Sequence, residues 1–169
     1  KVEGDEEGVF TNLLIENLEK SSSFRYRGDR GAFSLQVKII GIETEKIGFQ
    51  RDKEEISGEL LAVLRPSENR DKLYIELSVF ADLGKEVLGP YFFQETITYD
   101  YVDGNSLEDL SFLKGDKRET SLQFSLGQLQ GIFPAKKGAR KDLFKKIAEK
   151  IVERLSLDHD RLLSRKSPS

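Results

Sequence analysis

The chain has 169 residues, which is enough for one domain with a substantial core but too short for two comfortable ones. Its net charge of −3 provides no strongly basic field that would indicate a nucleic-acid partner. The absence of cysteine excludes disulfides, thiolate metal sites and thiol nucleophiles.

The N-terminal part of the sequence predicts one amphipathic helix. From Val9 to Lys20 the apolar residues are spaced to cover a single helical stripe. The run Ser21-Ser22-Ser23 is expected to end this helix. A short strand over 24–27 should then turn at 28–31 into a long strand, in which Phe33, Leu35, Val37 and Ile39 alternate with polar residues.

The middle of the chain predicts the centre of a sheet. The run 72–82 has the two-residue period of a strand with one buried face, and 86–102 should return beside it as an antiparallel partner. Gly89-Pro90 is expected to break the returning strand. Residues 51–55 are expected to form a polar tip, and residues 60–64 form a short apolar run. Residues 65–71 are expected to form a turn, because the fixed φ angle of Pro66 suits the first turn position.

The C-terminal part predicts a second amphipathic helix from about Arg140 to Leu155. Its expected apolar face holds seven residues: Leu143, Phe144, Ile147, Ala148, Ile151, Val152 and Leu155. Residues 103–135 should be a long, partly mobile loop with short helices and an edge strand near Leu122-Phe124. The segment 156–169 is expected to be a polar tail.

Together these elements predict one α+β domain over 1–155. The arrangement is a two-layer sandwich in which two amphipathic helices pack on one face of a mostly antiparallel four-stranded sheet, because each apolar surface needs a partner. Lys38, Glu76 and Ser78 should lie on the opposite, open face. Exposed aromatic or aliphatic side chains on that face would indicate a protein partner.

The search for reactive groups yields no catalytic residue, metal site or cofactor motif. His159 is the only histidine, and we interpret it as a solvated residue at the edge of the tail. The tripeptide Arg27-Gly28-Asp29 fits a hairpin turn better than an integrin motif. An enzyme is therefore the least favoured class.

Two groups of basic residues are candidate anion sites, since Lys and Arg form charge-assisted bonds with phosphates. The first consists of Arg51, Lys53, Arg65, Arg70 and Lys72, expected at one end of the sheet. The second consists of Lys136, Lys137, Arg140, Lys141, Lys145, Lys146 and Lys150, on the start and outer face of the last helix. The alternative reading, a solvated face balanced by neighbouring carboxylates, is favoured in each case.

Several segments resemble one known family. They are Gly4-Asp5-Glu6-Glu7-Gly8, Ile47-Gly48-Phe49-Gln50-Arg51-Asp52, Arg65-Pro66-Ser67-Glu68-Asn69-Arg70, Leu88-Gly89-Pro90 and Phe124-Ser125-Leu126-Gly127-Gln128-Leu129. In these segments and in element order the chain resembles the chlamydial branch of the LptE-like lipopolysaccharide-assembly lipoproteins.

The resemblance implies a non-enzymatic lipoprotein on the periplasmic side of the outer membrane. Such proteins are lipid-anchored, plug a β-barrel translocon partner and help to deliver lipopolysaccharide to the cell surface. The resemblance also implies lipopolysaccharide contact through basic residues near one end of the sheet, for which Arg51, Lys53, Arg65, Arg70 and Lys72 are candidates by location. The anchoring cysteine is expected upstream of Lys1. A cell-envelope lipoprotein that binds only proteins is the alternative.

Overall fold

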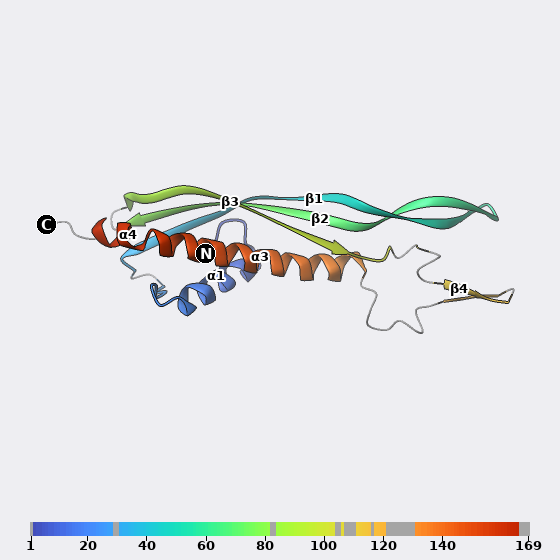
Figure 1. Cartoon of the computed structure of the whole chain (residues 1–169), viewed down its shortest axis with the longest axis horizontal. Coiled ribbons are helices and arrows are strands. Elements are labelled where there is room, and N and C mark those ends of the chain that lie inside the picture. The colour runs from blue at the N-terminus through green and yellow to red at the C-terminus, as the bar shows by residue number, and fades with distance from the viewer. Residues whose placement is uncertain are drawn as a thin grey trace. The chain divides into compact units, whose positions relative to one another are not determined.

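The computed structural model describes residues 2–28, 31–81, 84–103, 106, 111–115, 117–120 and 131–165, without side chains for 55, 111–113, 118–120 and 165. The elements in chain order are α1 (Val9–Lys20), β1 (Phe33–Ile56), β2 (Glu59–Ala81), β3 (Glu86–Asp100), β4 (Ser111–Lys114), β5 (Lys117–Thr120), α3 (Ile132–Leu157) and α4 (His159–Arg165) (Figure 1).

The contacts between Cα atoms divide the chain into two compact units. The first unit comprises Lys1–Glu43, Lys72–Thr96 and Lys141–Ser169, and the second comprises Thr44–Asp71 and Ile97–Arg140. The three long strands and α3 each contribute residues to both units.

The principal sheet has three antiparallel strands in the order β1-β2-β3. Ser57 and Gly58 connect β1 to β2 with φ angles of 56° and 84°, the left-handed conformation that a tight two-residue hairpin requires. In β2 the buried residues alternate with half-buried ones, and Leu73, Ile75, Leu77 and Val79 are 0% exposed. The two-residue period of the sequence therefore predicted the part of β2 from Lys72 onward.

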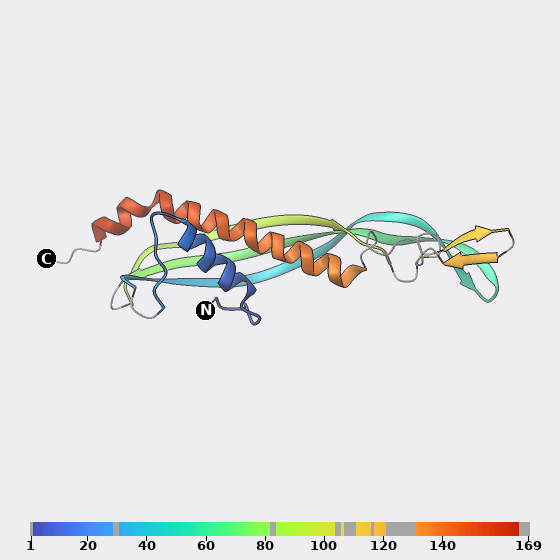
Figure 2. The ribbon, with the colours of Figure 1, turned by 90° about the horizontal axis from the view of Figure 1, so that it is seen from below.

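In the first unit, two helices cover one face of the sheet. α1 buries Phe10, Leu14 and Leu18, which lie on one stripe of the helix. The ring of Phe10 lies 5.4 Å from that of Phe144 in α3. Figures 1 and 2 show α1 and α3 on the same side of the strands. The two-layer α+β arrangement is thus confirmed for this unit.

The start of α1 is held by a side chain that precedes the helix. Gly8 is the N-cap residue and has no side chain to offer, so Asp5 takes that role. Its Oδ2 accepts hydrogen bonds from the backbone N–H and the hydroxyl of Thr11, both at 2.7 Å. Because Asp5 is only 5% exposed, these two bonds compensate for the loss of water around its carboxylate.

The sheet differs from the expected one in strand number and in length. It has three strands rather than four, residues 24–27 are not a strand, and β4 and β5 form a separate two-stranded hairpin. The expected turn at 65–71 is wrong, because Pro66 lies within β2. The Tyr101 N–H donates to the Ser67 C=O just after β3 ends, so Pro66 lies beyond the part of β2 that has β3 as a neighbour. The expected break at Gly89-Pro90 is also absent, since β3 is continuous.

The last helix is longer than its apolar stripe indicated. α3 begins at Ile132 rather than near Arg140, and its predicted face buries Leu143, Ile147, Ala148, Ile151 and Leu155. Residues 159–165 form α4, so this part of the expected polar tail is helical. The edge strand expected near Leu122-Phe124 lies outside the described residues.

Candidate functional site

Arg65, one of the five predicted anion-binding cations, is surrounded by carboxylates. Its side chain is 13% exposed and its Nε lies 2.9 Å from Asp52 Oδ2. Glu54 and Asp103 lie 3.7 and 3.8 Å from its other nitrogens. Asp52 is itself 2% exposed, so Arg65 neutralises a buried charge. A role in holding β1 and β2 together accounts for this arginine.

Arg70 pairs with a carboxylate at a different point along the strands from Arg65. Arg70 Nη1 lies 3.7 Å from Glu45 Oε2, seven positions before Asp52 on β1. Seven strand residues span about 23 Å, so Arg70 and Arg65 lie at different points along the strands. Lys72 belongs to the first unit and is half-buried.

Arg51 and Lys53 lie on one face of the β1–β2 hairpin, here called its outer face, which is opposite the face that carries the Asp52–Arg65 pair. Asp52, between them in β1, pairs with Arg65, so its neighbours point to the opposite face. Both residues are exposed. Both cations are therefore placed where a ligand could reach them.

Three large apolar side chains share that outer face. By strand alternation, Leu60 and Leu64 of β2 lie opposite the Arg65 side, and Phe49 lies two positions before Arg51. They are 57% (Phe49), 55% (Leu60) and 69% (Leu64) exposed. We call Phe49, Arg51, Lys53, Leu60 and Leu64 the ribbon face. The apolar run 60–64 is visible in the sequence, but the turn expected at 65–71 separated this run from the central strand and from the cations.

The interior of the second unit holds a small polar network. Tyr99 and Tyr101 pack with Ala135 and Ala139, and their hydroxyls reach Asp71 and Asn69 at 3.4 Å. Burial raises the pKa of both tyrosines above the ordinary value of 10.0, and the Asp71 carboxylate adds to this for Tyr99. Both phenols thus keep their protons at neutral pH.

The network is linked to α3 by one ion pair. Arg140 Nε lies 3.5 Å from Asp71 Oδ2, and Asp71 is 0% exposed. Because Asn69 and Asp71 are fully enclosed, no substrate could reach them without rearrangement of the interior. The geometry is that of a structural network that balances a buried charge.

The rest of the described part of the chain offers few groups that could form a metal site or a catalytic site. Within the described ranges, no group of three or more His, Asp or Glu side chains could hold a metal ion. No described helix is both long and apolar enough to cross a membrane. His159 is not a free tail residue: it begins α4 and its ring meets the edge of Phe24 at 5.7 Å.

The open face of the sheet in the first unit carries an exposed aromatic ring. Tyr91 hydrogen-bonds Asp158 on the helix side, so the next residue, Phe92, points to the other face and is 69% exposed. A hollow of about 210 Å³ on the sheet is lined by Gln36, Lys38, Glu76, Ser78, Phe80 and Glu86. As predicted, Lys38, Glu76 and Ser78 lie together outside the core.

Comparison with known proteins identifies the fold alone. No protein-family model matches the chain. No curated protein matches its sequence. The minor lipoprotein from Acinetobacter baumannii has a similar structure, with a TM-score of 0.50 and 8% identity over 93% of this chain and 88% of that one. A putative lipoprotein from Caulobacter crescentus CB15 aligns with a TM-score of 0.44 and 16% identity over 95% and 87%. The chain thus shares its fold with a lipoprotein of a Gram-negative bacterium.

Proposed function

We propose that this protein is a non-enzymatic lipoprotein of the cell envelope that acts in lipopolysaccharide assembly. In this proposal it resides on the periplasmic side of the outer membrane, held by a lipid anchor upstream of the present chain. It serves as a plug and assembly factor for a β-barrel translocon partner and contacts lipopolysaccharide directly.

The observation that carries the proposal is the ribbon face. Lipopolysaccharide combines acyl chains with phosphate groups, and a surface that recognises it needs apolar side chains beside cations. Phe49, Leu60 and Leu64 supply exposed apolar area, and Arg51 and Lys53 supply the positive charge. Arg65 contributes indirectly, because its pairing with Asp52 fixes which side chains of β1 point outward.

Two further points support the proposal. The fold is shared with the minor lipoprotein from Acinetobacter baumannii, which is consistent with an envelope lipoprotein. The polar groups of the second unit are engaged with one another rather than arranged as a nucleophile and base, which favours binding over catalysis.

Binding of purified lipopolysaccharide to the immobilised chain, measured at increasing salt, tests the proposal. The Arg51→Glu/Lys53→Glu variant should bind at least about tenfold more weakly, a loss of about 1.4 kcal/mol, because two phosphate contacts become repulsive. Wild-type affinity should also fall as salt screens these charges.

A matched control is Lys137→Glu/Lys141→Glu, which changes two exposed lysines of α3 and produces the same net charge. It should retain wild-type affinity. Equal loss in both variants would show that net charge alone governs binding. Loss only in the α3 variant would move the site to the second basic group, and either outcome would overturn the assignment to the ribbon face.

A second candidate function is a protein-interaction module without glycolipid contact. It is favoured by Phe92, whose exposed ring on the open sheet face suits a protein partner. The two functions separate experimentally. If the protein is an interaction module, purified lipopolysaccharide should not bind to it. A β-barrel partner should still cross-link to a photoreactive residue placed at position 92.

A further inference from the structure

A cavity of about 560 Å³ lies in the first unit, and every described residue that lines it belongs to that unit. Its volume is within the range of about 300–1,000 Å³ typical of small-molecule sites. α1 contributes Leu14 and Leu18 to the wall, the sheet contributes Leu35, Val37 and Val79, and the C-terminal helices contribute Leu155, Leu162 and Leu163. These residues form one aliphatic wall of the cavity, whose remaining lining includes polar residues such as Thr11, Ser23 and Ser34.

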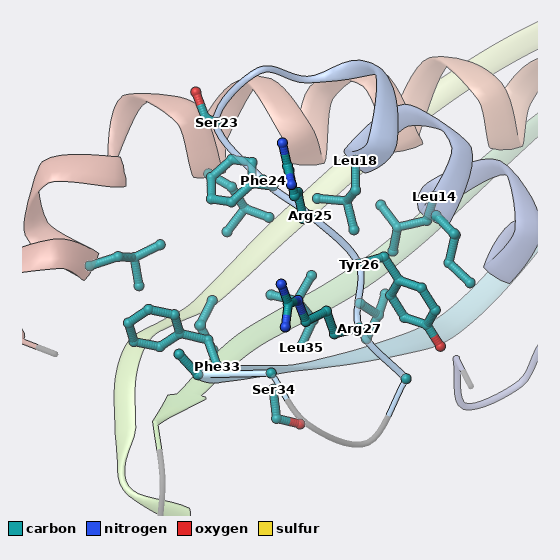
Figure 3. A pocket seen from close by; sticks show the side chains of 18 of the residues that line it. Leu14, Leu18, Ser23, Phe24, Arg25, Tyr26, Arg27, Phe33, Ser34 and Leu35 are labelled. Atoms are coloured by element: carbon teal, nitrogen blue, oxygen red, sulfur yellow. The ribbon is translucent and has the colours of Figure 1, made fainter.

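The segment 23–28 between α1 and β1 forms one side of the cavity (Figure 3). Two contacts hold it there. Glu19 Oε1 accepts a hydrogen bond of 2.8 Å from the backbone N–H of Tyr26, and the rings of Phe24 and His159 pack edge to face. Both contacts come from helices of the first unit and fix the segment along the rim of the cavity.

The described charged side chains that line the cavity are cationic, while the Glu19 carboxylate of α1 is engaged with the rim backbone at Tyr26. Arg25 and Arg27 are exposed residues of the rim, and the half-buried His159 also lines the cavity. No Asp or Glu occurs among the described lining residues, although the chain as a whole contains 30 acidic residues and has a net charge of −3. In the part of the chain that the structure describes, no ion pair engages either arginine. The mouth is therefore suited to an anion.

We propose that this cavity binds a single-chain amphiphile, with its acyl chain against the leucines and its anionic headgroup at Arg25 and Arg27. A free phosphate would use the rim and leave the aliphatic wall in water. An uncharged alkane or alcohol would use the wall and leave both guanidinium groups without a partner. The combination of a basic rim and an aliphatic wall therefore favours a ligand whose acyl chain ends in a carboxylate or a phosphate.

Displacement of a dansyl-labelled undecanoic acid from the purified chain tests this site. Palmitate and lysophosphatidylglycerol should both displace the probe, and their comparison distinguishes a carboxylate from a phosphate headgroup. Hexadecanol should be at least about tenfold weaker, since it lacks the charge, and inorganic phosphate should not compete.

Two variants test the geometry. Arg25→Glu/Arg27→Glu should weaken palmitate at least about tenfold and leave hexadecanol unchanged. Leu35→Trp should fill the cavity and weaken all acyl ligands, with thermal melting used to verify that the variant folds. Because the arginines are exposed, their substitution tests the site even if the tryptophan variant is unstable.

Arg51→Glu/Lys53→Glu is the control that separates this site from the proposed lipopolysaccharide surface. It should retain palmitate binding, so that either site can fail alone. The cavity proposal would be overturned by a probe that does not bind, by equal affinity for hexadecanol and palmitate, or by unchanged palmitate affinity in the rim variant.

Discussion

Several polar contacts of the first unit converge on Asp158. It is 3% exposed and receives the hydroxyl of Tyr91 at 3.0 Å. Arg154 and Arg161 pair with its two oxygens at 2.9 and 3.1 Å. The guanidinium of Arg154 also lies over the ring of Tyr91, 4.6 Å from its centroid. The hydrogen bond to Tyr91, with the Asp158 charge, raises the pKa of Arg154 above its ordinary value. One carboxylate thus joins α3 and α4 to β3.

Replacement of Asp158 by alanine should lower the free energy of unfolding by about 1–3 kcal/mol, because the half-buried Tyr91 and Arg154 lose their acceptor. Asp160→Ala is the matched control, since the Asp160 side chain is 102% exposed. Its effect should stay within about 0.5 kcal/mol. Urea denaturation measures both, and equal effects would show that the contacts at Asp158 contribute nothing.

Replacement of glycine by alanine should have opposite effects on stability at two positions, Gly89 and Gly138. Gly89 has a φ of 107°, and a Cβ there would lie 2.7 Å from the Leu77 carbonyl oxygen. Gly89→Ala should therefore destabilise the fold by about 1–3 kcal/mol. Gly138 lies inside α3 with nothing within 4 Å of an added Cβ, so Gly138→Ala should stabilise the fold by about 0.5–1 kcal/mol. Melting temperatures that shift in the same direction would contradict this prediction.

At the scale of elements, α3 is attached to β3 by a charged pair in addition to its apolar face. Lys150 forms a salt bridge with Glu95, whose side chain is 18% exposed. The hydrogen bond from Lys150 holds the pKa of Glu95 below its ordinary value of 4.5. The folded state therefore favours the ionised carboxylate, and this contribution is present above pH 4.5 and lost as pH falls through the folded pKa.

Glu95→Gln should accordingly cost about 0.5–1 kcal/mol near neutral pH, a small value because Lys150 is half in water. The difference from wild type should shrink as pH is lowered from about 5 to about 3. In a Lys150→Ala background the same substitution should lose most of this pH dependence, as a double-mutant cycle would show. A difference that is constant with pH would exclude the pair as its source.

An element was predicted accurately where its own sequence carries a complete apolar pattern, and less accurately where it does not. α1 was predicted with its observed limits, because Ser21 follows a complete apolar stripe. β1 and β2 were cut short, because the alternation of apolar and polar residues fades toward the turn that joins them. Residues 59–62 are all exposed, and the apolar run 60–64 has no two-residue period that would mark it as a strand. The start of α3 was missed because its first residues, including Phe133 at 84% exposure, present no continuous apolar stripe.

At the scale of the whole molecule, the question is which surfaces remain available to partners. In the first unit, helices cover one face of the sheet, while Phe92 is 69% exposed on the other. Phe92→Ser should leave the free energy of unfolding within about 0.5 kcal/mol of wild type and weaken retention of the proposed β-barrel partner in cross-linking from intact cells. Undiminished retention would exclude this face as the contact.

The candidate site could be predicted from the sequence only in part. The basic residues were identifiable by type, yet type did not reveal that Asp52, Glu54 and Asp103 surround Arg65. Asp52 and Glu54 lie on β1 and Asp103 follows β3, so their convergence on Arg65 of β2 depends on strand register. The cavity between α1 and the sheet was missed for the same reason, since residues 23–28 contain no motif that marks them as a rim.

β1 forms a border of the sheet, and its position has a consequence for self-association. Unpaired backbone groups along such a border are a template on which a second copy could add, and charged side chains there oppose it. Arg51 and Lys53 are charges of this kind, so exchanging them for alanine would remove protection from aggregation together with any ligand contact. Glutamate at both positions keeps the border charged, which makes charge reversal the cleaner probe of recognition.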